Sequence, residues 1–491
     1  MIEFKNVSFS YQGQEQGILR NINLKIKKGE CILLCGRSGC GKTTITRLVN
    51  GLIPNLYQGY LEGNILLKGH DILNLSMYQI AEEVGSVFQN PRTQFFNVDT
   101  DSEIAFGVEN KALPWKELSG RVDDTIRELN IEKLRNRNIF ELSGGEKQKI
   151  AFASVYAMNP DIYLLDEPSS NLDMIAINEL RKNLQLIKRQ GKTILIAEHR
   201  IYYLMDIVDR IVYLEQGEIR NIYTPNEFRE LSDSQRIDMG LRAIELHNQT
   251  IYESKIAKGS PVLEINNASL SYKQNTILKH INLKVMAGEV IAVIGNNGAG
   301  KTTFSRALCG LHKISEGDIF WNGEKQKIKD RLKLSYMVMQ DVNYELFADS
   351  VEAECSFGIK KFDDKRVEHA LKKLGLFPYR KRHPNTLSGG QKQRTAVAVS
   401  MVCNKNLLVF DEPTSGLDYD SMMRVAELIY DLASSEKIIF IVTHDYEFVC
   451  RTCSRVLYLD KGRVTEDLLI NKENKHKIQS KRTIVRILNS L

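Results

Sequence analysis

The sequence predicts an α/β fold made of two tandem domains, each built on a largely parallel β-sheet. Two observations support this prediction. Four sequence motifs occur twice in the same order, and the second copies lie about 250 residues after the first. Within each copy, short runs of Val, Ile and Leu alternate with helix-like stretches, which is typical of parallel strands joined by helices. A period of this length is too long for a solenoid, so it indicates two domains.

The repeated motifs align the two copies. The first copy carries GRSGCGKTT, LSGGEKQK, YLLDEPSSNLD and AEHR, and the second carries GNNGAGKTT, LSGGQKQR, LVFDEPTSGLD and VTHD. Lys42 and Lys301 are 259 positions apart, whereas Asp166 and Asp411 are 245 apart, so the first copy has 14 extra residues between its first two motifs. Part of this surplus lies in Ile53–Gly63.

We place the first domain at residues 1–225, a linker at 226–260, the second domain at 261–469 and a basic tail at 470–491. The linker is not rich in Gly or Ser. Its apolar spacing suggests helical pieces packed on a domain, through Phe228, Leu231, Ile237, Leu241 and Ile244. We interpret the tail as a solvated surface, with contact to anionic lipid as the alternative.

The composition sets limits on function. A net charge of +6 over 491 residues suits polyanionic ligands such as nucleotides, but it does not require nucleic acid, and we expect no nucleic-acid partner. No apolar run approaches the roughly 18 residues that cross a bilayer, and the N-terminus alternates like a strand rather than a signal peptide. The eight cysteines form no disulfide framework, which fits a reducing cytosol. A role at a membrane would therefore require a separate membrane partner.

Each glycine-rich loop follows an apolar strand, Cys31–Cys35 or Val290–Ile294, and precedes a helix-like run, which is the context of a phosphate-binding loop. Glycines let the backbone N–H groups face phosphates, and the helix adds its positive N-terminal end. A lysine in each loop supplies a charge for the β- and γ-phosphates, and the following threonine supplies a Mg²⁺ ligand. The predicted nucleotide-binding residues are Gly36, Arg37, Ser38, Gly39, Cys40, Gly41, Lys42, Thr43 and Thr44, then Gly295, Asn296, Asn297, Gly298, Ala299, Gly300, Lys301, Thr302 and Thr303.

Two acidic pairs follow apolar strands. Asp166 and Asp411 end their strands, where a carboxylate can hold Mg²⁺. Glu167 and Glu412 come next, and they are our candidates for polarising the attacking water. The alternative is a helix-capping role for each glutamate, because a proline follows that could open a helix. The phosphate loop in the same copy favours the catalytic interpretation.

The LSGG motif resembles the signature of ATP-binding-cassette (ABC) ATPases in both copies, and the resemblance covers about 460 of the 491 residues. It implies two P-loop NTPase domains, each with a RecA-like core, a helical subdomain and an antiparallel β subdomain. It also implies ATP and Mg²⁺ as cofactors and ATP hydrolysis as the activity. In the family, two ATP molecules lie between head-to-tail domains, so we expect intramolecular pairing of the two domains.

The resemblance also assigns roles to particular residues. The signature residues, which would bind the γ-phosphate held by the opposite domain, are Ser143, Gly144, Gly145, Ser388, Gly389 and Gly390. Gln89 and Gln340 match the glutamines that join the metal site, and His199 and His444 match the histidine that contacts the γ-phosphate. Tyr11 and Tyr272 match the aromatic residue that stacks on adenine; packing residues at strand ends are the alternative.

The stretch after each glutamine, FQNPRTQFF or MQDVNYELF, lines the groove for a membrane subunit in this family. With SEIAFGVEN it resembles energy-coupling-factor (ECF) importer ATPases, although Gln340 departs from the usual pattern by preceding Asp341 and Val342. That resemblance implies an integral membrane scaffold protein, a small substrate-binding membrane protein, a peripheral place at the cytoplasmic face and a vitamin or other micronutrient as cargo. The alternatives are a sugar or peptide importer ATPase and a soluble tandem ABC protein acting on the ribosome.

The aromatic residues in these stretches also carry a prediction. We expect Phe95, Phe96 and Phe347, with Gln94 and Leu346, to face a docking groove for an apolar helix. The alternative is that the phenylalanines belong to the core.

Overall fold

The computed structural model describes residues 1–13, 17–170, 172–246, 260–272, 275–359 and 363–470. The chain divides into two compact units, Met1–Ile244 and Glu245–Leu491. In the ranges just given, no helix has both the length and the apolar character needed to cross a bilayer. The predicted α/β fold with two tandem domains is confirmed.

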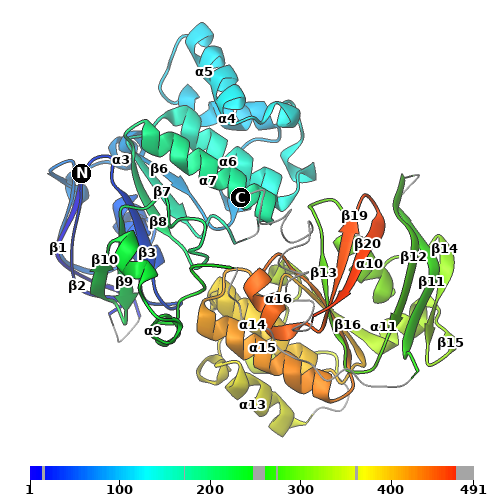
Figure 1. The fold of residues 1–491 in the computed structure, drawn as a ribbon. Helices are drawn as coiled ribbons and strands as arrows, with labels where there is room; N and C mark the ends of the chain where they lie inside the picture. The colour runs from blue at the N-terminus through cyan, green and yellow to red at the C-terminus, as the bar shows by residue number, and fades with distance from the viewer. Residues whose placement is uncertain (14–16, 171, 247–259, 273–274, 360–362, 471–491) are drawn as a thin grey trace. The chain divides into compact units, whose positions relative to one another are not determined.

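The first unit is built on a six-stranded central sheet. Its strands are β3 (Cys31–Cys35), β6 (Val84–Val87), β7 (Ile162–Asp166), β8 (Thr193–Ala197), β9 (Arg210–Glu215) and β10 (Glu218–Tyr223). Their order is β10-β9-β3-β8-β7-β6, and all pairs are parallel except β9 with β10 (Figure 1). Every residue of β3 and β8 is buried, as expected for parallel strands covered on both faces. The carboxyl ends of β3, β7 and β8 therefore meet at one edge, where open α/β sheets bind ligands.

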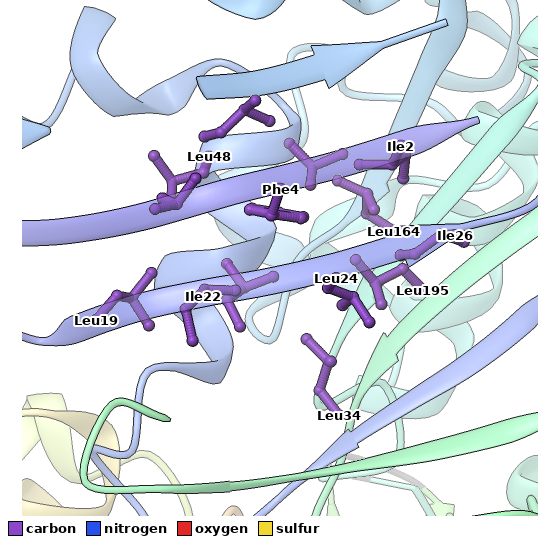
Figure 2. Packing of buried hydrophobic residues seen from close by; sticks show 14 of the residues in the cluster. Ile2, Phe4, Leu19, Ile22, Leu24, Ile26, Leu34, Leu48, Leu164 and Leu195 are labelled. Carbon is purple, nitrogen blue, oxygen red and sulfur yellow. The ribbon is translucent and has the colours of Figure 1, made fainter. Parts of the chain in front are cut away.

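A second, antiparallel sheet covers this core. It consists of β1 (Ile2–Tyr11), β2 (Leu19–Ile26), β4 (Gly59–Leu67) and β5 (His70–Asp71), in the order β2-β1-β4-β5. Figure 2 shows Ile2, Phe4 and Leu24 from this sheet packed near Leu164 and Leu195 of the central sheet. Burying a large apolar side chain contributes about 1.5–3 kcal/mol, so this cluster fixes the antiparallel sheet on the central sheet.

Helices complete the first unit. They are α1 (Lys42–Val49), α2 (Leu52–Asn55), α3 (Met77–Glu83), α4 (Thr100–Glu109), α5 (Trp115–Glu128), α6 (Gly144–Met158), α7 (Met174–Arg189), α8 (Pro225–Arg229) and α9 (Asp233–Asp238). α4 and α5 pack on α6 at one end of the unit, and together they form the expected helical subdomain (Figure 1). Part of the surplus in the first copy forms α2 and the start of β4.

The second unit repeats the architecture. Its central sheet contains β13 (Val290–Ile294), β16 (Ser335–Val338), β17 (Leu407–Asp411), β18 (Ile438–Val442), β19 (Arg455–Asp460) and β20 (Arg463–Leu469), in the order β16-β17-β18-β13-β19-β20. Its antiparallel sheet contains β11 (Leu263–Tyr272), β12 (Asn275–Val285), β14 (Glu316–Trp321) and β15 (Glu324–Lys325), in the order β12-β11-β14-β15. When the strand order of this central sheet is read from the opposite end, it matches the strand order of the central sheet in the first unit.

Most helices of the second unit occupy corresponding places in its chain order; α16 has no helical counterpart in the first unit, where turns join β8 to β9. They are α10 (Lys301–Leu308), α11 (Ile328–Leu334), α12 (Val351–Ser356), α13 (Asp364–Lys373), α14 (Gly389–Val402), α15 (Tyr419–Ser434) and α16 (Tyr446–Thr452). α12 and α13 pack on α14, so this unit has a helical subdomain of its own (Figure 1).

The segment after β10 contains α8 and α9 and belongs to the first unit by its contacts. Phe228 and Leu241 are buried, whereas Leu231 and Ile237 are only half-buried. Residues 247–259 of the predicted linker and residues 471–491 of the predicted basic tail lie outside the described residues. The boundaries of the linker and the character of the tail therefore stay predictions.

Candidate nucleotide-binding and catalytic sites

Both phosphate loops connect a central strand to a helix, β3 to α1 and β13 to α10. Their first glycines have positive φ angles, 143° for Gly36 and 152° for Gly295. A Cβ atom at either position would lie 2.2 Å from a carbonyl oxygen, that of Leu214 or Leu459. Only glycine fits there, so the start of each loop is fixed by a close approach to the neighbouring strand.

The loop lysines lie inside the curl of the loop. Lys42 Nζ donates to the carbonyl oxygens of Gly36 (2.8 Å) and Arg37 (3.1 Å). Lys301 Nζ donates to those of Gly295 (2.7 Å) and Asn296 (3.2 Å). Both side chains are buried, so each ammonium group is held beside the backbone that would face the phosphates. The other predicted loop residues lie in the same turns or at the start of α1 and α10: Ser38, Gly39, Cys40, Gly41, Thr43, Thr44, Asn297, Gly298, Ala299, Gly300, Thr302 and Thr303.

Two of the three predicted metal ligands, the threonine and the aspartate, meet in each unit. Thr43 Oγ1 donates to Asp166 Oδ1 at 3.2 Å, and Thr302 Oγ1 donates to Asp411 Oδ2 at 3.1 Å. Burial raises the pKa of Asp166 to about 7, with a further contribution from the charge of Glu167. Burial also raises the pKa of Asp411. A hydroxyl and a buried carboxylate suit Mg²⁺, which binds through one or two protein oxygens together with water and phosphate oxygens.

Glu167 and Glu412 adopt the left-handed backbone conformation, with φ angles of 45° and 52°. This conformation costs about 1–3 kcal/mol for a residue other than glycine and tends to occur at functional sites. Each strained turn is held by a hydrogen bond from the glutamate N–H to the carbonyl oxygen of Ala197 or Val442, at 2.8 Å in both cases. The same strain at matching positions supports a functional role for both glutamates.

The side chains around the two glutamates differ. In the first unit, Gln89 Nε2 donates to Glu167 Oε2 at 2.5 Å, and His199 Nε2 lies 3.4 Å from Glu167 Oε1. In the second unit, His444 Nε2 lies 3.7 Å from Glu412 Oε1, and the Thr443 hydroxyl donates to Glu412 Oε2 at 3.2 Å. The structure thus brings each predicted histidine to its glutamate.

Gln340 occupies the same place as Gln89, two residues after the end of a strand of the central sheet. Its neighbour Asp341 caps a short 3-10 helix, η5 (Val342–Tyr344), by accepting from the Asn343 N–H at 3.2 Å. Asn90 caps η2 (Pro91–Thr93) in the same way. The departure at Asp341 therefore preserves the local structure of the loop.

The signature serines begin helices. Ser143 caps α6 and Ser388 caps α14, each in a capping box with the residue three positions later, Glu146 or Gln391. Gly144, Gly145, Gly389 and Gly390 form the first turns, whose N–H groups make a helix terminus suited to anions. The predicted contact of these residues with a nucleotide of the opposite domain stays a prediction.

The predicted adenine-stacking residues have different surroundings. Tyr11 is half-buried, its hydroxyl accepts from Arg47 Nη1 at 3.0 Å, and it lies 3.2 Å from Thr44 Oγ1. The Arg47 guanidinium lies 4.1 Å from the centre of the Tyr57 ring. Tyr272, in contrast, is 61% exposed. Tyr11 is therefore held by its neighbours, whereas Tyr272 presents most of its surface to solvent.

Several residues at these sites were not singled out from the sequence. Arg47 and Tyr57 surround Tyr11, and Tyr57 comes from the surplus segment of the first copy. Glu198 and Arg200 flank His199. The sequence signal that could have identified them is the difference between AEHR in the first copy and VTHD in the second. Their contacts depend on the fold, which the sequence pattern alone does not give.

Comparisons with known proteins agree with the fold. A family model described as ABC transporter matches residues 19–170 and 278–415. A protein of Treponema denticola, provisionally named an ABC transporter ATP-binding protein, is 48% identical over 98% of this chain and 99% of its own length.

Two solved structures are similar as well. A model of ribosome-bound archaeal Pelota and ABCE1 contains a chain similar over 98% of this chain and 80% of that one, with a TM-score of 0.70 and 22% identity, a likeness of fold. The structure of cbiO1 from Clostridium perfringens, part of the ABC transporter complex cbiONQ, covers 48% of this chain and 92% of that one, with 29% identity and a TM-score of 0.43.

Proposed function

The chain belongs to the family of ABC transporter ATP-binding proteins, and we propose that it is the ATP-hydrolysing subunit of an ECF-type importer for a vitamin or other micronutrient. In this proposal it lies at the cytoplasmic face of the membrane and binds an integral scaffold protein, which works with a small substrate-binding membrane protein. Two ATP molecules bind between its paired domains.

The residues of each unit divide the work of hydrolysis. Lys42 and Lys301 hold the β- and γ-phosphates in their loops. Mg²⁺ would be held by Thr43 with Asp166 in the first unit and by Thr302 with Asp411 in the second. Gln89 and Gln340 would complete these two metal sites. When bound, the metal would neutralise charge on the phosphate oxygens. Glu167 and Glu412 orient and polarise the attacking water. His199 and His444 contact the γ-phosphate, and the signature serines of one domain close over the nucleotide of the other.

The observation that carries the importer proposal is an exposed phenylalanine after each glutamine loop. Phe96 is 75% exposed and Phe347 is 67% exposed. Phe95 is only half-buried and Leu346 is buried, so the two residues just before the exposed phenylalanines contribute less to the surface. Large exposed aromatic side chains beside a nucleotide-sensing loop suit the docking of an apolar helix.

Each exposed phenylalanine is presented in the same way. A buried glutamate of α4, Glu103, accepts from the N–H groups of Phe96 (3.0 Å) and Asn97 (2.8 Å). Glu354 of α12 accepts from Phe347 and Ala348, at 2.7 Å each. A buried carboxylate that holds the backbone in both units explains why the aromatic side chain faces outward, since the loop cannot turn without losing these bonds.

The proposal is tested by purifying the tagged chain from gently solubilised membranes of its host and identifying the co-eluting proteins by mass spectrometry. We expect small integral membrane proteins with the native chain and none with the double variant Phe96→Ser and Phe347→Ser. Trp115→Ser is the matched control, because Trp115 is also exposed, at 77%, but lies at the start of α5.

Melting temperature and ATPase activity of the purified double variant should match those of the native chain, because an exposed side chain contributes little to folding. Co-elution of ribosomal proteins instead of membrane proteins would favour the ribosomal alternative. Unchanged co-elution by a stable double variant would contradict the docking surface.

A further inference from the structure

The residues on either side of the predicted histidines differ between the units. His199 lies between Glu198 and Arg200, whereas the second unit has Thr443 and Asp445 at these positions. All four neighbours are at most 6% exposed. Burying ionisable groups is unfavourable unless they are well bonded, so the contacts of Glu198 and Arg200 indicate their role.

The Glu198 carboxylate is surrounded by donors. Oε1 accepts from the N–H groups of His199 (2.7 Å) and Arg200 (3.1 Å). Oε2 accepts from the N–H of Ser169 (3.2 Å) and the hydroxyl of Tyr203 (2.9 Å). These four partners come from the histidine segment, from the turn after Glu167 and from Tyr203, so the carboxylate ties these parts of the first unit together.

Arg200 also binds the turn that contains Ser169. Its Nη1 donates to the carbonyl oxygens of Ser169 (3.3 Å) and Leu172 (3.5 Å), in the turn that follows Glu167. The second unit makes a comparable connection with different groups, because the Thr414 hydroxyl donates to Asp445 Oδ2 at 2.8 Å. Thr414 occupies the position of Ser169. Both units therefore tie the histidine segment to this turn.

The two arrangements leave the candidate catalytic glutamates with different donors. In the second unit, the His444 N–H (3.4 Å) and the Thr443 hydroxyl (3.2 Å) both point to Glu412 Oε2. In the first unit, the His199 N–H is bound by Glu198 instead. Glu167 accepts its short hydrogen bond from Gln89, which belongs to the loop after β6.

We propose that Glu198 and Arg200 are positioning residues for ATP hydrolysis in the first unit, and that they make Glu167 depend on Gln89. Glu198 holds the His199 N–H, and Arg200 binds the Ser169 turn, so in the described part of the chain Glu167 receives no backbone donor from the histidine segment and takes its hydrogen bond from the glutamine loop. The inference rests on the proposed function, because it takes Glu167 as the catalytic carboxylate. It assigns a stronger dependence on the glutamine loop to the first site than to the second.

The test measures kcat and KM for MgATP in the full chain. Glu167→Gln, measured first, gives the share of turnover that depends on the first site. Glu198→Gln keeps the shape of the side chain, but in either orientation it turns an amide NH2 towards at least one backbone N–H that can only donate. We expect it to remove more than about half of that share, with KM within about two-fold of the native value. A melting temperature within about 2 °C of native would exclude general unfolding as the cause.

A chain carrying Ser169→Thr, Glu198→Thr and Arg200→Asp together installs the arrangement of the second unit. We expect it to recover at least about half of the lost share, because Glu167 regains donors from the histidine segment. Gln89→Ala should then cost about three-fold less in the swapped chain than in the native chain, since the part of the dependence on Gln89 that acts through Glu167 has been removed while any role of Gln89 at the metal site remains. A purely structural role for Glu198 would leave the effect of Gln89→Ala unchanged.

Native turnover in Glu198→Gln would overturn the inference, and so would equal effects of Gln89→Ala in the native and swapped chains. If Glu198→Gln fails to fold, Tyr203→Phe removes a single donor from the carboxylate, and we expect a smaller loss of kcat at unchanged KM; native kcat there would also overturn it. If Glu167→Gln has no effect on turnover, the proposed function of this site fails first, and the inference fails with it.

Discussion

In the first unit the candidate catalytic glutamate accepts a hydrogen bond from the glutamine loop, whereas in the second unit it accepts from the histidine segment. The motif residues themselves, Glu167 with His199 and Glu412 with His444, match in type, spacing and backbone strain. Glu198 and its counterpart Thr443, which stand next to the motifs, also differ in the groups that they bind. Matching motifs therefore do not fix every contact of the candidate catalytic glutamate, because the neighbouring residues form different hydrogen bonds in the two units.

At two further positions, corresponding residues of the two units also have different surroundings. Gln94 accepts from the N–H of Phe88 and donates to the carbonyl oxygen of Ser86, while its counterpart Glu345 accepts from the N–H of Met339. The tyrosine predicted to stack on adenine is held by Arg47 and Thr44 in the first unit and is largely exposed in the second. Each difference changes a property that can be measured one unit at a time.

The largest expected effect tests whether both units are catalysts. Glu167→Gln and Glu412→Gln should each lower turnover at their own site on the order of 10²-fold, because the water is no longer oriented by a carboxylate, and the double variant should lower total ATP turnover by that factor. Nucleotide binding should persist in both variants, and the double variant should hold two ATP molecules. Phosphate release and equilibrium nucleotide binding measure the two quantities.

The matched control is Glu230→Gln, an exposed glutamate after α8, which should turn over at the native rate. If either single catalytic variant keeps the full native turnover, that unit is not a catalyst and the two sites are unequal.

The next effect concerns stability. Burial raises the pKa of Glu345 from 4.5 to about 7, and the charges of Glu354 and Asp411 add to the shift. The folded state therefore binds this proton more tightly than the unfolded state, and stability falls as pH rises from about 4.5 to 7. Glu345→Gln removes this loss, so at pH 8 we expect the variant to be more stable by on the order of 2 kcal/mol.

Near pH 4.5 the advantage of the variant should vanish, and thermal melting at several pH values measures the trend. The converse variant, Gln94→Glu, should destabilise the first unit more at pH 8 than at pH 5. A gain that is the same at every pH would show that the charge of Glu345 is not its cause.

The smallest effect tests the adenine sites. Tyr11→Phe removes the hydroxyl that is bonded to Arg47 and Thr44, and hydrogen bonds of this kind contribute about 0.5–1.5 kcal/mol. We expect ATP binding to the first site to weaken by at most about that amount, and Tyr272→Phe to leave the second site unchanged. Each affinity is measured with the other site disabled by Lys301→Ala or Lys42→Ala. Equal losses of ATP affinity at both sites would show that the different surroundings of Tyr11 and Tyr272 do not affect nucleotide binding.

The fold was largely predictable from the sequence. The phosphate loops, the acidic strand ends and the histidines are short motifs whose function requires a fixed local geometry, so their spacing indicates which strands and helices carry them. The meeting of Thr43 with Asp166, and of Thr302 with Asp411, agrees with that prediction.

The donors around the glutamates could not be predicted. Gln89 and Glu167 are 78 residues apart, and Glu198 and Ser169 are 29 apart, so their contacts depend on the packing of separate loops. The position of Tyr57 also depends on how the surplus segment folds, because nothing in its sequence directs it to Arg47. Whether the phenylalanines are exposed was equally open, since a buried Glu103 or Glu354 reveals its role only through its contacts.

The left-handed backbone at Glu167 and Glu412 has a consequence for engineering. Glycine and asparagine adopt this conformation more readily than glutamate, so replacing either glutamate would relieve strain and raise heat resistance. Selection for stability alone would therefore favour loss of the carboxylates. Thermostability and turnover are in conflict at these two positions, and a library screened for heat resistance should keep both glutamates fixed.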